Sequence, residues 1–150
     1  MNYKRLIFYV LITLIIGSLP SIFVYSSDIY ETINKPLLSP PGIVFPIVWF
    51  ILFVLMGVSM YLVSTKTKEE EYYKIYFLQL FVNTLWTPLF FGLGNFFLAL
   101  IDLILLIVLV VRMIKMFYKV NKTSAYLNIP YLVWLLFAFY LNISIVFLNR

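Results

Sequence analysis

The sequence contains neither cysteine nor histidine, and only 11% of its 150 residues are charged. Without cysteine the chain can form no disulfide, no thiol nucleophile and no thiolate metal site. Without histidine it lacks the commonest metal ligand, the usual haem ligand and the usual general base at neutral pH. These absences exclude catalysis by a Ser–His or Cys–His pair, and we expect neither a metal site nor a bound cofactor.

Hydrophobic residues, in contrast, make up 64% of the chain. A soluble domain has about 45–50% apolar and about 25% charged residues, and a helix that crosses a bilayer needs about 20 mostly apolar residues. We therefore predict an all-α integral membrane protein, built as one compact bundle of five transmembrane helices. The helices are expected at about residues 6–25, 43–64, 73–91, 95–118 and 125–148.

The first uncharged run, Leu6 to Tyr25, follows two basic residues and resembles a signal peptide in outline. The apolar region of a signal peptide has about 7–15 residues, and this run is longer, so it predicts a retained first helix. Pro20 lies near its far end and is expected to kink it. Gly17 and Ser21 form a pair of small residues that would allow close helix approach.

Lys and Arg are distributed unevenly between the two sides of the predicted bundle. The N-terminus, the second loop and the fourth loop share one side and carry nine of these residues, against Lys35 and Arg150 on the other. Cytoplasmic loops are enriched in Lys and Arg. We therefore predict a multi-pass protein of the cell membrane, with a cytoplasmic N-terminus and with the C-terminus and the first loop outside. The net charge of +5 reflects these loops rather than nucleic-acid binding.

The first loop, residues 26–42, is long for a helical bundle, where connections usually have about 2–8 residues. A long loop of this kind is either a lid over a binding site or a floppy surface linker. It ends at Pro40-Pro41, and proline is compatible with the first turn of a helix. The proline pair therefore predicts a stiff entry into the second helix.

Large side chains recur along the second helix at steps of four, four, three and four. They are Phe45, Trp49, Phe53, Met56 and Met60. This spacing places them on one face of a helix. Such a face indicates either helix packing or one wall of a pocket for a flat ligand.

The third and fifth helices carry polar groups beside large rings. On the third helix Gln79, Asn83, Trp86 and Phe90 share a face, and on the fifth Trp134, Ala138, Leu141 and Asn142 follow one another closely. Side-chain amides within hydrocarbon need hydrogen-bond partners. These faces are therefore expected to look into the protein, where the amides bind either neighbouring helices or a ligand.

Asp102 is the only acidic or basic residue placed well inside a predicted span. A carboxyl group in a membrane span is a functional candidate by default, and its alternative role is that of a structural hydrogen-bond acceptor. Because no second carboxyl group lies in a span, general acid–base catalysis by a carboxylate pair has no support.

Three sets of residues carry a resemblance to a known family. The first is Tyr30, Lys35-Pro36, Pro40-Pro41, Pro46, Trp49 and Met56-Gly57; the second is Gln79, Asn83, Trp86, Pro88 and Phe90-Phe91; the third is Pro130-Tyr131, Trp134, Phe137-Ala138 and Asn142. Together they resemble the translocator protein family, also called tryptophan-rich sensory proteins (TspO), in a bacterial member. The likeness covers essentially the whole chain and matches its helix count and order.

The resemblance implies a receptor-like protein, often a homodimer, with an aromatic pocket that opens toward the first loop. Its implied ligands are porphyrins such as protoporphyrin IX, and synthetic isoquinoline carboxamide or benzodiazepine-type drugs. The implied pocket lining, carried over position by position, is Tyr30, Trp49, Phe53, Asn83, Trp86, Phe90, Trp134, Ala138 and Leu141.

Two functions stay open from the sequence. In the first, porphyrin is a substrate that is degraded in light and oxygen, with Trp49 and Trp134 as the reactive pair. In the second, the protein binds tetrapyrroles or other lipophiles without catalysis, as a sensory or transport protein. The chain also departs from the family pattern, because Ile29 and Leu38 stand where the family commonly has tryptophan.

Overall fold

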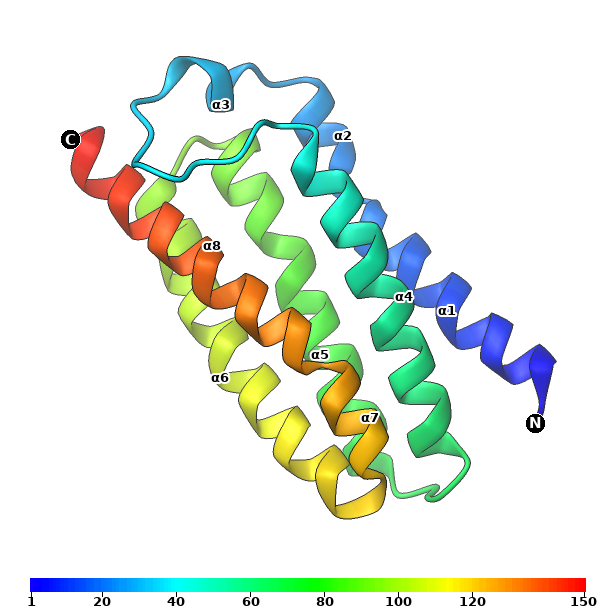
Figure 1. The fold of residues 1–150 in the computed structure, drawn as a ribbon. Coiled ribbons are helices and arrows are strands. Elements are labelled where there is room, and N and C mark those ends of the chain that lie inside the picture. Colours follow the sequence, from blue (N-terminus) through cyan, green and yellow to red (C-terminus); the bar gives the residue numbers. More distant parts are fainter.

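The computed structural model describes all 150 residues and contains helices and turns but no strand (Figure 1). Five segments are long and apolar enough to cross a membrane: Tyr3–Tyr25, Val44–Ser64, Glu70–Gly92, Phe96–Val120 and Lys122–Leu148. The predicted all-α bundle of five membrane-spanning helices is thereby confirmed.

Three of the five spans are interrupted, and a proline lies at each interruption. In chain order the helices are α1 (Tyr3–Ser18), α2 (Ser21–Tyr25), α3 (Ile29–Thr32), α4 (Val44–Ser64), α5 (Glu70–Thr87), the π-helical turn η1 (Pro88–Gly92), α6 (Phe96–Val120), α7 (Lys122–Leu127) and α8 (Ile129–Leu148). Proline has no N–H and its ring displaces the preceding turn. The predicted kink at Pro20 is confirmed as the break between α1 and α2.

The polar ends of the helices extend beyond the hydrophobic runs from which their bounds were expected. The third span begins at Glu70 rather than near residue 73, and the fifth begins at Lys122 rather than near residue 125. Acidic residues in the first turn of α5 complement the helix dipole. Asn121 caps α7, where its side-chain oxygen accepts a hydrogen bond from the Ser124 N–H at 2.9 Å. Hydropathy alone does not detect these polar first turns, so the bounds expected from it begin too late.

The two ends of the bundle have different composition. The loop that contains α3 lies at the same end as the C-terminus, whereas the N-terminus, the α4–α5 connection and the turn into α7 lie at the other end (Figure 1). The second end therefore carries the nine Lys and Arg residues counted from the sequence.

Helices α1 and α4 approach each other closely at two glycines. A Cβ atom at Gly57 would lie 2.6 Å from the Cα atom of Val10, and a Cβ at Gly17 would enter the ring of Phe53. Gly17 therefore has the predicted role of a small contact residue. Ser21 does not share it, because the chain turns at Pro20 and leaves Ser21 exposed on α2.

Helix α6 packs against both α5 and α8, and the main core lies between these helices and α4. From the large residues of α4, the side chains of Phe53, Met56 and Met60 are buried, and Trp49 is half-buried against the same core. This face of α4 therefore packs within the bundle at its middle, and its aromatic end lies toward the first loop.

Candidate functional site

Trp49 of α4 and Trp134 of α8 each contact an aromatic ring of the other helix. The Trp49 ring contacts Tyr131 edge to face, with centroids 6.1 Å apart and planes at 72°. The Trp134 ring contacts Phe45 in the same manner, at 5.8 Å and 68°. Phe45 and Trp49 are one turn apart on α4, as are Tyr131 and Trp134 on α8, so the four rings interlock. The structure thus brings together the two tryptophans proposed as a reactive pair.

Trp86 approaches α8 from a third helix, at a different height. Its Nε1–H donates a hydrogen bond to Oδ1 of Asn142 at 2.9 Å, and its ring stacks on Phe90 at 4.8 Å between centroids. The Asn142 amide also donates to the carbonyl oxygen of Phe96 at 2.9 Å. The indole is therefore fixed in orientation by a buried amide.

A chain of hydrogen bonds joins the buried amides of α5 to α8. Asn83 Nδ2 donates to the Tyr131 hydroxyl at 2.7 Å, and that hydroxyl donates to Gln79 Oε1 at 2.8 Å. Gln79 Nε2 lies 3.7 Å from the sulfur of Met56. These amides therefore bind neighbouring helices, one of the two roles expected from the sequence. Sequence reasoning missed the central place of Tyr131, although its motif with Pro130 had singled it out.

Replacing Tyr131 by phenylalanine should destabilise the protein by about 1–3 kcal/mol, because the change leaves two buried amide groups without their partner. The free energy of unfolding in detergent micelles, followed by circular dichroism, measures the effect. Tyr140→Phe is the matched control, since the Tyr140 hydroxyl donates to the Leu37 carbonyl at 2.7 Å in an exposed place. An equal loss of unfolding free energy in the two variants would show that the buried hydrogen bonds of Tyr131 stabilise the protein no more than the exposed one of Tyr140.

The loop at residues 26–42 folds back on itself above these rings. The Tyr30 hydroxyl donates to the Pro40 carbonyl at 2.7 Å, and Lys35 Nζ donates to the Tyr30 carbonyl at 2.6 Å. The Tyr30 ring also meets Phe45 at 5.3 Å. Burial, and secondly the charge of Glu31, raise the pKa of Tyr30, so the hydroxyl keeps the proton that it donates. The loop is therefore joined directly to the ring cluster.

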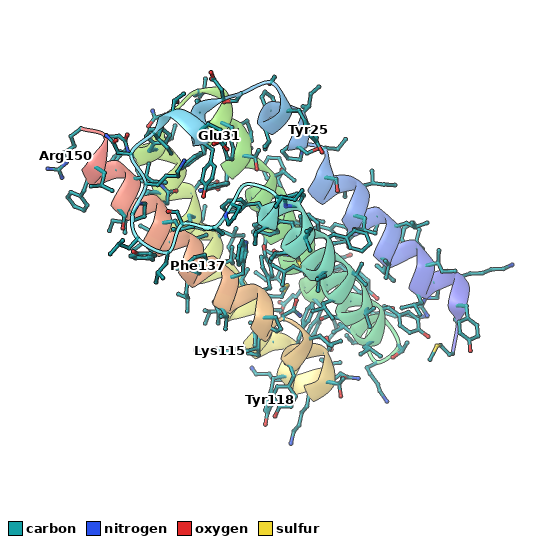
Figure 2. The ribbon with its side chains drawn as sticks, turned by 45° about the horizontal axis from the view of Figure 1, so that its top comes forward. Tyr25, Glu31, Lys115, Tyr118, Phe137 and Arg150 are labelled. Carbon is teal, nitrogen blue, oxygen red and sulfur yellow. The ribbon has the colours of Figure 1, made fainter.

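The same loop is fastened to the C-terminal end of α8. The Asn34 N–H donates to Asn149 Oδ1 at 2.9 Å, and Asn149 Nδ2 donates to the Asn34 carbonyl at 2.9 Å. Figure 2 shows Glu31 of the loop at the end of the bundle that also carries Arg150. The loop is thus a structured cover with a helical turn of its own, which favours the lid interpretation over a floppy linker.

The tip of the loop carries two exposed leucines. Leu37 and Leu38 are 85% and 81% exposed, and Leu38 has a φ of +68°. A residue with a β-carbon adopts this left-handed conformation at a cost of about 1–2 kcal/mol. Leu38, one of the two positions where the resemblance led us to expect tryptophan, is therefore turned away from the ring cluster.

The remaining predicted lining residues lie on α4, on α8 and, for Phe90, on the turn η1 that follows α5. Phe53, Phe90 and Leu141 are buried, and Ala138 is half-buried beside Trp134 on α8. Between α4 and α8 the rings contact one another edge to face. The predicted rings thus form two groups: Trp49 and Trp134 contact Tyr131 and Phe45 between α4 and α8, and Trp86 stacks on Phe90 at the end of α5.

A separate hollow of about 610 Å³ opens at the loop end of the bundle, outside the aromatic cluster. It lies between α2 and η1 and is lined by Phe23, Ser26, Ser27, Asp28, Ile29, Pro88, Phe91, Gly92 and Leu93. None of the predicted lining residues belongs to it. The sequence features that lie at this hollow are the proline and the glycine near the end of the third span, Pro88 and Gly92.

Asp102 is buried on α6, and its Oδ2 atom has no hydrogen-bond partner within the chain. Ala99, almost one turn before it, is also buried, so this side of α6 faces the bundle. The carboxyl group is therefore an internal feature, and the structure gives it no paired acid.

Comparison with known proteins finds similar sequences over most of the chain. The model of the TspO/MBR family matches residues 9–148. The tryptophan-rich protein TspO of Archaeoglobus fulgidus is 36% identical over 153 residues and covers 99% of both chains. The protein of the same name from Chlorobaculum tepidum is 36% identical, over 80% of this chain and 78% of its own. The translocator protein of Sus scrofa is 34% identical, over 75% of this chain and 70% of its own.

Proposed function

Since this chain belongs to the TspO/MBR family, we propose that it is a membrane receptor-like protein that binds porphyrin between α4, α5 and α8. Protoporphyrin IX is the representative ligand. The observation that carries the proposal is the group of interlocked rings of Trp49, Trp134, Phe45 and Tyr131 beneath the structured loop, with Trp86 held against α8 nearby. Each indole contributes to a face that contacts α8 or lies on it.

The chemistry of the cluster suits a flat ligand. A porphyrin has an apolar aromatic centre, and stacked or edge-on rings of Trp and Phe suit its faces. Its acidic tails lie at one edge, and Lys35 supplies a cation in the loop above the rings. The ligand would insert between Phe45 and Trp134 and exchange ring–ring contacts for contacts with the macrocycle. The absence of His and Cys favours free-base porphyrin over haem.

We propose further that bound porphyrin is degraded in light and oxygen. Illuminated porphyrin with oxygen would oxidise an adjacent indole, and the tryptophan radical would then attack the macrocycle. Trp49 and Trp134 are the proposed reactive pair, because their rings lie in one interlocked group of four. The alternative is a sensory or transport protein that binds the same ligand without consuming it.

Illumination of the purified protein with protoporphyrin IX tests both steps. Binding should quench tryptophan fluorescence to saturation, and the Soret band should then fall under light in air but not under nitrogen. Isoquinoline carboxamide or benzodiazepine-type compounds, proposed for the same space, should displace the porphyrin. Saturable quenching without any loss of the Soret band would favour the sensory alternative, and the absence of saturation would contradict the binding site.

The loop is proposed to control ligand release. Asn149→Ala removes two hydrogen bonds to Asn34, each contributing about 0.5–1.5 kcal/mol, so porphyrin should dissociate about tenfold faster. Stopped-flow displacement followed by porphyrin fluorescence measures this rate. Asn2→Ala, at the opposite end of the bundle, is the control and should release porphyrin at the wild-type rate. A common rate for all three proteins would argue against a lid.

The family membership supports a multi-pass membrane protein, and three finer points remain proposals. We propose that it lies in the cell membrane, with a cytoplasmic N-terminus and an external loop and C-terminus, because nine basic residues lie at the end opposite the loop. The homodimer implied by the resemblance likewise remains a prediction.

A further inference from the structure

The end of the bundle opposite the loop carries a second hollow, of about 370 Å³. It lies between the beginning of α5 and the end of α6. Its lining residues, named here the basic hollow, are Glu71, Tyr72, Arg112, Lys115, Met116 and Lys119. The proposed porphyrin site shares none of these residues.

The basic hollow has a surplus of positive charge that the protein does not neutralise. Arg112, Lys115 and Lys119 are spaced by three and four residues, which places them on one face of α6. None of them forms an ion pair, since the one ion pair of the chain joins Lys74 to Glu70 at 3.0 Å. Three cations therefore face a single acidic side chain, that of Glu71, and the hollow favours an anion.

The position of the hollow corresponds to the level of lipid headgroups. The three cations come near the end of the fourth span, after a stretch whose only charge is Asp102. Figure 2 shows Lys115 and Tyr118 together at the end away from the loop. The exposed Tyr118 ring lies 6.1 Å from Tyr126, and tyrosines of this kind are enriched at the membrane–water interface.

The walls of the hollow combine polar and apolar surface. Tyr72 is held with its ring tilted against the buried Phe117, at 6.4 Å between centroids, and Met116 is half-buried beside it. An ammonium or guanidinium group binds phosphate oxygens, and Arg does so with two parallel hydrogen bonds. The tyrosine and methionine surface suits the glycerol and the beginning of an acyl chain. Basic pockets between membrane helices recognise lipid headgroups in this way.

We propose that the basic hollow binds the phosphate headgroup of an anionic phospholipid, such as phosphatidylglycerol. Arg112 would donate two hydrogen bonds to the phosphate, and the charges of Lys115 and Lys119 would add electrostatic attraction. Glu71 weakens binding by its like charge, which makes it the residue whose removal should strengthen the site.

The test is a titration of detergent-solubilised protein with dioctanoyl phosphatidylglycerol, followed by native mass spectrometry. Each cation near an anionic headgroup changes affinity about fivefold, so Arg112→Gln with Lys115→Gln should weaken binding about 25-fold. Glu71→Gln should strengthen it severalfold, and this variant keeps the test decisive if the double variant does not fold. Dioctanoyl phosphatidylcholine should bind far more weakly than phosphatidylglycerol.

Lys66→Gln with Lys68→Gln is the matched control, because it removes the same charge from the same end of the bundle but outside the hollow. It should change the affinity less than about twofold. Equal weakening by both double variants, or no gain in Glu71→Gln, would overturn the proposal. Inorganic phosphate that binds as tightly as the lipid would assign the hollow to a soluble anion and overturn the lipid assignment.

Discussion

Replacing Trp49 and Trp134 together by phenylalanine is expected to leave porphyrin bound but to abolish its loss under light. Phenylalanine keeps an aromatic face for the macrocycle, so saturable binding persists. It lacks an indole that can be oxidised, so the interlocked rings no longer hold a tryptophan donor for the radical step. The rate of Soret decay in air, divided by the amount of bound porphyrin, measures the effect.

Trp86→Phe is the control for this experiment. Trp86 belongs to a different group of rings and is fixed by Asn142. Its replacement should leave the normalised rate of decay near the wild-type value. Undiminished decay in the Trp49 and Trp134 double variant would exclude their role as the reactive pair, whereas loss only in Trp86→Phe would transfer the role to Trp86.

Replacing Gly57 by alanine is expected to destabilise the bundle by about 1–3 kcal/mol, the usual cost of an extra methyl group in a filled interface. The new Cβ would lie 2.6 Å from Val10 Cα and 2.9 Å from the Tyr9 carbonyl oxygen. Because both contacts are with backbone, α1 has to move away from α4. Alanine is the better helix former by about 1 kcal/mol, so the expected loss opposes the local preference. Thermal unfolding in detergent measures it.

Gly42→Ala adds the same methyl group where the nearest atom, Glu31 Oε1, is 3.9 Å away. It should leave the melting temperature almost unchanged. A stabilised Gly57→Ala variant would mean that helix propensity outweighs the contact, and that α1 and α4 are not held at this distance in the membrane.

The sequence predicted the positions of the tryptophans better than their surroundings. Regular spacing placed Trp49, Trp86 and Trp134 on inward faces, because a helix repeats every 3.6 residues. Spacing within one helix cannot reveal which residue lies across the interface. The hydrogen bond from Trp86 to Asn142, and the place of Tyr131 between two amides, depend on how α5 and α8 are aligned.

The loop and the basic hollow show the same limit. The length of the loop suggested either a lid or a linker, and the contact that decides between them joins Asn34 to Asn149, which are 115 residues apart. Likewise, the sequence shows the cations of α6 only as basic residues on one side of the bundle. They form a hollow only because the beginning of α5, with Tyr72, lies beside them.

The contacts among these rings also imply that thermal stability and affinity for porphyrin oppose each other. In the free protein the four rings already contact one another: Trp49 with Tyr131, and Phe45 with Trp134. A flat ligand that enters would have to break these ring–ring contacts. A ligand gains only the difference between its own contacts and those that it replaces. Variants that loosen these rings should therefore bind porphyrin more tightly while unfolding more easily, so affinity and thermal stability would vary in opposite directions across a mutant series.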